Sequence, residues 1–375
     1  MSLSGRGDHD DAPAFFLMKV LSPILILLVL PLNAHTESAA VQDRGKDVAR
    51  ERSLETLPDI ETLIKTGKTV EAEAKLDAMS QRIGRTAAVD ATYGDLLLSR
   101  KRYAEAMLHY EAALKANPKS TAARQGETDS AICLALHYKA SGDGDRTIAI
   151  LEHAITILPE EPTLLTDLGI QATAEKHWNV AEKSLLAAYR VTPKAPSVVY
   201  ALARLETEQG NFTKAESYFR EYFQLRPNDA SAHYGLGRAF QMEQQPEKAA
   251  EEFLRSVTLQ PVQTEAYYQL GEIALQAGRE EEARANYEKT LSRLPTHGGA
   301  LTGMGMLEYR AHDYAAAKTS LERAVGNSPD YQPAHYYLGL TLRRLGDSSG
   351  AERELHTATE LAATQQGKGA PVAAQ

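Results

Sequence analysis

Tyrosine and arginine recur at regular steps in the second half of the chain, and these two side chains together could recognise another polypeptide. Tyrosine offers a broad amphipathic contact area at low entropic cost, and arginine donates forked hydrogen bonds to carboxylates. Several of the tyrosines lie 34 residues apart, and arginines follow two of them by four residues. The candidate binding residues are Tyr200, Arg204, Tyr234, Arg238, Tyr268, Tyr309, Arg310, Tyr336, Arg343 and Arg344.

A second interpretation of the same residues stays open. Aromatic stripes at helical spacing are more often packing than binding sites, so these tyrosines would pack between neighbouring helices. The arginines would then be solvated or paired with Glu208 and Glu265. The two interpretations differ in what alanine at Tyr234 and Arg238 would remove, which is either partner binding alone or folding stability.

Residues for catalysis or metal binding do not form a recognisable motif. The 11 histidines include no HExxH and no pair at metal-ligand spacing. GxSxG, a phosphate-binding glycine loop and GxGxxG after a strand are also absent from the sequence. We therefore predict no catalytic residue, no cofactor and no metal site, and we expect that the protein is not an enzyme.

The charge argues against nucleic acid as a partner. With 41 Lys and Arg against 50 Asp and Glu, the formal net charge is -9, and an acidic surface repels phosphate backbones. Cys133 is the single cysteine, so no intramolecular disulfide can form. Packing alone must hold the fold.

Four ladders of residues share one 34-residue period, which indicates an internal repeat. Prolines stand at Pro159, Pro193, Pro227, Pro261, Pro295 and Pro329. Alanines keep the same step at Ala181, Ala215, Ala249, Ala283, Ala317 and Ala351. A small residue recurs at Ala135, Gly169, Ala203, Gly237, Gly271, Gly305 and Gly339. A large apolar residue recurs at Leu151, Leu185, Phe219, Phe253, Tyr287, Leu321 and Leu355.

These ladders predict two antiparallel helices in each repeat. A Gly or Ala lets two helix axes approach closely, and the bulky residue fills the space beside it. Proline ends the second helix because it has no N–H and clashes with the preceding turn. Gly210, Gly278 and Gly346 lie between the two helices of their units, where a left-handed residue commonly ends a helix. One unit alone cannot offset its ordering cost, so the units must stack.

The repeat resembles the tetratricopeptide repeat, whose signature has Leu-Gly in the first helix, Ala-x3-Phe in the second and Pro at the end. The first element is matched at Leu168-Gly169, Leu236-Gly237, Leu270-Gly271 and Leu338-Gly339. The second is matched by Ala106 with Tyr110, Ala215 with Phe219, Ala249 with Phe253, and Ala283 with Tyr287. The resemblance implies an all-α, right-handed α-solenoid (superhelix) of about nine helix-turn-helix units. It also places the candidate tyrosines and arginines on the concave wall formed by the first helices.

The solenoid is expected over residues 53–363. Pro118 and Pro159 are 41 residues apart, so about seven extra residues are expected near 119–127, and we expect residues 119–147 to be irregular. The glycine-rich stretch Gly298–Gly305 resembles a ligand loop, but the repeat phase assigns Gly305 to a helix crossing and Gly298-Gly299 to the turn between units. Residues 364–375 lack apolar periodicity and are expected to form a disordered tail.

The amino terminus is typical of an export signal. Residues 20–32 (VLSPILILLVLPL) are apolar, follow Lys19 and precede a small-residue cleavage pattern that ends at Ala34. The run is short for a transmembrane helix, which needs roughly 20 apolar residues. We predict a signal peptide over residues 1–34, with Met18 as a candidate start, and a linker over 35–52. The protein is then periplasmic or secreted; anchoring to the membrane by an uncleaved signal is the alternative.

The expected function is a non-catalytic scaffold that binds a peptide or protein partner in the concave groove of the solenoid. Some tetratricopeptide proteins bind carboxyl-terminal peptides through a lysine and asparagine clamp, and Tyr and Arg stand here at the corresponding positions. One alternative is a membrane-tethered assembly or secretion factor of the cell envelope. Another is a relative of glycosyltransferases that carry such repeats, for which an array ending near Ala363 leaves only a dozen residues. The sequence predicts no oligomeric state.

Overall fold

The computed structural model describes residues 56–369, and it describes the side chains of residues 56–364. The expected signal peptide and linker lie outside these residues, as do residues 370–375. Within the described range all regular structure is helical, in eighteen helices. They are α2 (Leu57–Lys65), α3 (Thr69–Ile83), α4 (Ala87–Ser99), α5 (Tyr103–Ala116), α6 (Thr121–Ala140), α7 (Gly144–Ile157), α8 (Pro162–Ala174), α9 (Trp178–Val191), α10 (Pro196–Glu208), α11 (Phe212–Leu225), α12 (Ala230–Met242), α13 (Pro246–Leu259), α14 (Thr264–Gln276), α15 (Glu280–Arg293), α16 (Gly298–Arg310), α17 (Tyr314–Asn327), α18 (Gln332–Arg344) and α19 (Ser348–Gly369).

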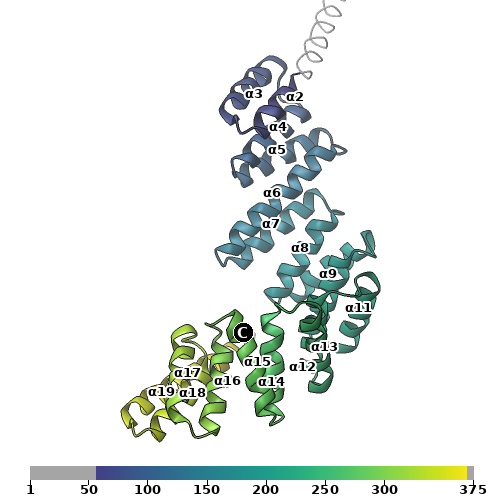
Figure 1. The fold of residues 1–375 in the computed structure, drawn as a ribbon. Coiled ribbons are helices and arrows are strands. Elements are labelled where there is room, and N and C mark those ends of the chain that lie inside the picture. The colour runs from purple at the N-terminus through teal and green to yellow at the C-terminus, as the bar shows by residue number, and fades with distance from the viewer. Residues whose placement is uncertain (1–55, 370–375) are drawn as a thin grey trace, which may run out of the picture. The chain divides into compact units, whose positions relative to one another are not determined.

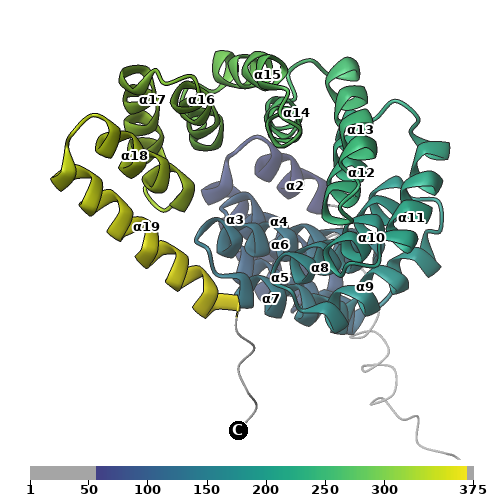
Figure 2. The ribbon, with the colours of Figure 1, turned by 90° about the horizontal axis from the view of Figure 1, so that it is seen from below.

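The eighteen helices form nine consecutive pairs. Each even-numbered helix packs against the odd-numbered helix that follows it, and each odd-numbered helix packs against the next even-numbered one. Figure 1 shows this order along the described chain, and Figure 2 shows the pairs α12/α13, α14/α15 and α16/α17 in the turned view. The first helices of neighbouring pairs, such as α8 and α10 or α16 and α18, also touch. The prediction of an all-α solenoid of about nine helix-turn-helix units is confirmed.

Glycines recur in the small-residue ladder because a large side chain of the same hairpin occupies the space where their Cβ atoms would lie. Tyr110, Phe219, Phe253 and Tyr287 are fully buried. A Cβ on Gly237 would lie 2.7 Å from the Phe253 ring, and one on Gly271 would lie 2.6 Å from the Tyr287 ring. Real Cβ atoms do not approach that closely, so glycine lets each hairpin close over its own aromatic residue.

The turn inside each pair contains one residue in the left-handed region. Gly67, Gly142, Gly210, Gly278 and Gly346 have φ between 73° and 86°. In the units between them the same place is held by Lys101, Lys176, Gln244 and His312, with φ of 60° to 62°. The turn geometry is therefore retained even where the sequence lacks the glycine that favours it.

The seven extra residues lengthen a helix instead of forming an irregular segment. Helix α6 has 20 residues, whereas α8, α10 and α12 have 13 each. Ser120 caps its start by accepting a hydrogen bond from the Ala123 N–H at 3.2 Å. The expectation of an irregular region over residues 119–147 is wrong, because seven residues make almost two helical turns and so keep the buried stripe on one side.

Two further expectations differ from the structure. Helix α19 continues to Gly369, so residues 364–369 of the expected tail are helical. Gly298 and Gly299 form the first turn of α16 and do not lie in a turn between units. A Cβ on Gly299 would lie 2.8 Å from the Tyr268 ring, so this glycine leaves room for a tyrosine that arrives from α14.

Candidate functional site

All ten candidate residues lie on first helices. Tyr200 and Arg204 are on α10, Tyr234 and Arg238 on α12, and Tyr268 on α14. Together with Glu265 and Glu272 of α14 they make up the surface that we call the first-helix face. The others form the C-terminal cluster, which consists of Tyr309 and Arg310 on α16 and Tyr336, Arg343 and Arg344 on α18.

Tyr200 and Tyr234 lean on the buried phenylalanine of their own hairpin. The Tyr200 ring meets Phe219 edge-on at 6.1 Å between centroids, and the Tyr234 ring lies 5.5 Å from Phe253. The Tyr200 hydroxyl donates to the Ser231 carbonyl on the next first helix at 3.4 Å. Both tyrosines remain partly exposed, and burial raises the pKa of each. They are fixed by packing and still offer one ring surface to a ligand.

Arg204 and Arg238 lie one helical turn beyond these tyrosines. Arg204 is exposed and Arg238 is half-buried. Arg238 lies near the Tyr234 hydroxyl and the Glu265 carboxylate, and its positive charge favours the ionised form of both groups. Among the described residues no carboxylate forms an ion pair with either guanidinium, and the charge of Arg204 acts on the Tyr200 hydroxyl by opposing the rise of its pKa. Arg204 therefore has no ion-pair partner in the described chain, whereas the Glu265 carboxylate partly offsets the charge of Arg238.

Glu265 is held in place by neighbours on both sides. The His297 Nδ1 accepts the Ala300 N–H at 3.0 Å, so its Nε2 carries the proton and donates to a Glu265 oxygen at 3.2 Å. The Gln269 amide donates to the other oxygen at 2.9 Å. The hydrogen bond from His297 is the largest cause of a lowered Glu265 pKa. Glu265 is therefore an acid that is hydrogen-bonded at both oxygens, and the charge of Arg238 contributes to its lowered pKa.

Glu272 has a structural role in the core. It lies at the place on α14 that Arg238 holds on α12, and it accepts a hydrogen bond from the buried Tyr287 hydroxyl at 2.6 Å. Asp95 on α4 does the same for Tyr110, also at 2.6 Å. Burial raises the pKa of both acids. Sequence inspection missed this pairing, although both acids precede their ladder tyrosine by 15 residues.

The C-terminal cluster is partly engaged within the chain. The Tyr309 ring packs edge-on against Tyr314 at 5.4 Å, and its hydroxyl accepts a hydrogen bond from Arg344 Nε at 3.4 Å. Arg310 pairs with Glu280 at 3.3 Å. Tyr336 is 43% exposed. Arg343 lines a shallow hollow between α18 and α19. Candidate residues with open side chains are thus fewer here than on the first-helix face.

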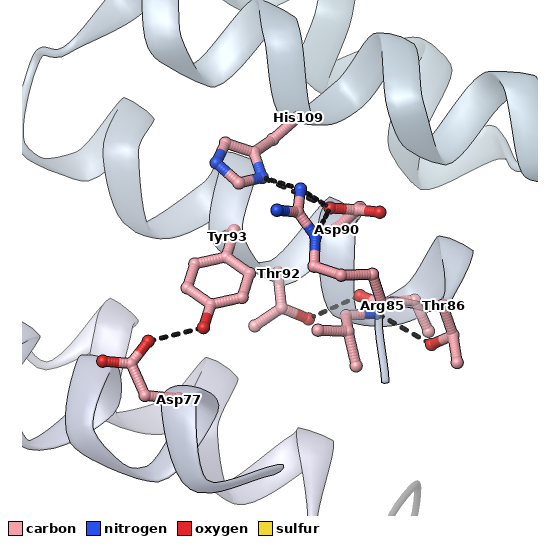
Figure 3. A network of polar contacts seen from close by, with 9 residues as sticks. Asp77, Arg85, Thr86, Asp90, Thr92, Tyr93 and His109 are labelled. Carbon is pink, nitrogen blue, oxygen red and sulfur yellow. Dashed lines mark hydrogen bonds and ion pairs between the residues drawn. The ribbon is translucent and has the colours of Figure 1, made fainter. Parts of the chain in front are cut away.

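A polar network ties α3, α4 and α5 together (Figure 3). Asp90, almost fully buried on α4, accepts hydrogen bonds from Arg85 and lies 3.3 Å from His109 Nδ1. The Tyr93 hydroxyl donates to Asp77 at 2.5 Å, and the Tyr93 and His109 rings stack at 5.2 Å. Burial lowers the pKa of His109 and raises that of Tyr93 to about 12. Because its polar groups interact with one another, the network holds the pairs α2/α3 and α4/α5 together.

Glu127 is the most unusual titratable group of the described chain. Its side chain is 0% exposed on α6, and neither carboxyl oxygen has a hydrogen-bond partner. Burial, and then repulsion from Glu111 on α5, raises its pKa to about 8. Glu111 is itself bound to His153 of α7 at 2.7 Å. The junction of α5, α6 and α7 therefore contains a carboxyl group that is protonated at neutral pH.

A further hollow lies away from the candidate residues. This hollow between second helices α13 and α15 has a volume of about 860 Å³ and is lined by Leu254, Glu251 and Lys289 among others; none of the ten candidate residues lines it. In residues 56–369 no three His, Cys, Asp or Glu side chains are placed to hold a metal ion. None of the described helices is long and apolar enough to cross a membrane.

Comparison with known families identifies the repeat. A family model described as tetratricopeptide repeat matches residues 167–230, 200–263, 234–297 and 302–365. A second model with the same description matches residues 91–120. These matches span more than half of the chain. A comparison with curated proteins finds no match.

Solved structures with a similar fold include PilF from Pseudomonas aeruginosa, at 20% identity, a TM-score of 0.47 and coverage of 62% of this chain and 98% of that one. A tetratricopeptide repeat protein from Parabacteroides merdae has 19% identity, a TM-score of 0.42 and coverage of 64% and 93%. MamA from Desulfovibrio magneticus has 17% identity, a TM-score of 0.39 and coverage of 45% and 96%. At these identities the likeness concerns the fold alone.

Proposed function

Because this chain belongs to the tetratricopeptide repeat family, we propose that it is a non-catalytic scaffold that binds a protein or peptide partner on the first-helix face. The observation that carries the proposal is the position of Arg204 and Arg238. Each lies one helical turn from a partly exposed tyrosine ring, and among the described residues neither forms an ion pair with a carboxylate, although Arg238 lies near Glu265. Flat aromatic surface next to an unpaired guanidinium is the composition that binding hot spots favour.

The proposal is tested by site-specific photo-crosslinking in the native compartment. A photoreactive amino acid replaces Arg204 on α10 in one variant and Arg220 on α11 in the control. Arg220 is also exposed, but it lies on a second helix and pairs with Glu216 at 2.8 Å. We expect one defined partner band from position 204 that is absent from position 220. The same bands from both positions would contradict a binding site on the first helices.

We also propose that the chain is exported and acts in the periplasm or outside the cell. The support is the apolar run of residues 20–32 behind Lys19 and the cleavage pattern ending at Ala34. Mass spectrometry of the mature amino terminus tests this. A start at His35 agrees with a cleaved signal and rules out the alternative in which the uncleaved segment tethers an assembly or secretion factor to the membrane. An intact terminus in a soluble cytosolic fraction would contradict export.

A further inference from the structure

We propose that the segment recognised on the first-helix face is acidic, and that its side-chain carboxylates pair with Arg204 and Arg238. This inference rests on the proposed function and adds the chemistry of the partner. It begins with the residue that stands 15 positions before the large ladder residue in each hairpin. In different hairpins that residue is an acid, an aliphatic residue or an arginine.

In most hairpins the residue at this position matches the buried ladder residue. Where the ladder has tyrosine, the position has an acid that accepts the hydroxyl, as Glu272 does for Tyr287. Where the ladder has leucine, the position is apolar in four hairpins: Leu136 with Leu151, Ile170 with Leu185, Met306 with Leu321, and Leu340 with Leu355. The first hairpin is an exception, because Glu61 precedes Leu76. The match is a hydrogen bond in the tyrosine hairpins and one of residue type in the leucine hairpins, where Leu136 is itself 57% exposed.

The two hairpins with phenylalanine depart from this rule. Phe219 and Phe253 are fully buried and have no hydroxyl group to satisfy, so no polar residue is required at this position. Arg204 and Arg238 stand there instead. Neither forms an ion pair within the described chain. Arg204 thus has no acidic partner in the described chain, and Arg238 has only Glu265, which already accepts hydrogen bonds from Gln269 and His297. An external carboxylate supplies the counter-charge that the fold does not.

The charge around the pair defines the ligand. The neighbouring first helices have Ile170 on one side and Glu272 on the other, so the positive stretch covers α10 and α12 only. A carboxylate suits the planar guanidinium, which can bind it with two parallel hydrogen bonds. A nucleic acid fits poorly, because its continuous phosphates would meet Glu265, Glu272 and a chain of net charge -9. An extended segment with acidic side chains, one for each arginine, fits both the positive charge of this face and its restriction to α10 and α12.

The experiment is selection from a library of random twelve-residue peptides displayed with both ends fused, so that no free carboxyl terminus can contribute. The full-length protein is the target, beside Arg204→Gln/Arg238→Gln and the control Arg190→Gln/Arg220→Gln. The control removes the same charge from the second helices α9 and α11. We expect selected peptides to be rich in Asp and Glu and to lose on the order of tenfold in affinity with the first variant but not with the control.

Charge reversal gives the second arm. Arg204→Glu/Arg238→Glu should select peptides rich in Lys and Arg. Selected peptides that crosslink to the first-helix face but show no acidic excess would overturn this inference and leave the proposed function intact. Equal losses with both glutamine variants would also overturn it, because they would show a general charge effect. Peptides that bind only away from α10 and α12, or no binders at all, would refute the proposed function as well.

Discussion

Replacing Glu127 by glutamine should stabilise the junction of α5, α6 and α7, and by an amount that depends on pH. The carboxyl group has an ordinary pKa of 4.5 and a pKa of about 8 in the folded chain. Between these values the unfolded chain releases the proton and the folded chain keeps it, so the free energy of unfolding falls as pH rises from 4.5 to 8. Above 8 both states are ionised and the loss is complete.

The magnitude follows from the shift. One pKa unit corresponds to about 1.36 kcal/mol, so the loss is at most about 3 kcal/mol at pH 7 and about 5 kcal/mol above pH 8. Glutamine keeps the shape and does not titrate. The Glu127→Gln variant should therefore match the natural protein near pH 4.5 and exceed its stability by up to about 3 kcal/mol at pH 7.

Hydrogen exchange measured helix by helix is the suitable assay, because hairpins of a solenoid open locally. Protection factors of amides in α5, α6 and α7 are compared at pH 5, 7 and 9, with Glu152→Gln, an exposed acid on α7, as the matched control. A difference between Glu127→Gln and the natural protein that stays constant over this range, or an equal gain from the control, would refute the reasoning.

Three further predictions concern the core, the turns and the polar network of α3, α4 and α5. Gly303→Ala puts a Cβ into the Tyr287 ring and should lower stability by about 1–3 kcal/mol, read from the urea midpoint; no change would mean that the ring can move aside. Gln244→Gly relieves a left-handed residue with φ of 62° and should raise the melting temperature through a gain of up to about 1 kcal/mol, whereas a loss would show that the turn is not strained. The pKa of His109 is lowered, chiefly by burial. As pH falls, His109 is therefore protonated in the unfolded chain at a higher pH than in the folded chain. Protection of α4 amides should therefore fall as pH drops below 6.5, and His109→Asn should abolish that dependence; an unchanged slope in the variant would assign it to another group.

The fold could be predicted because its determinants repeat. The spacing of Gly237 from Gly271, or of Phe219 from Phe253, gives the step, and close helix packing gives the reason for it. The lengthened α6 could not be recognised by the same means. A break in the spacing fixes only how many residues are added, while their helical state depends on the Ser120 cap and on contacts with α5 and α7.

The candidate site was predictable only in outline. The 34-residue register placed Tyr234 and Arg238 on one helix. It gave no sign that His297, at the start of α16, orients Glu265 on α14 of the preceding unit. Such a contact depends on which nitrogen of the histidine is already used to cap α16. A comparison of the residues 15 positions before each ladder residue could have distinguished Glu272, which binds the buried Tyr287 hydroxyl, from the arginines at the same position of other hairpins.

Each substantial helix–helix contact in residues 56–369 joins helices of the same unit or of adjacent units. A tension applied to the two ends of this region would consequently be transmitted through every interface in series, and the weakest would yield first. The interfaces around Glu127 and His109 contain groups whose pKa values shift on folding, so the force needed to extend the protein should depend on pH at these two places.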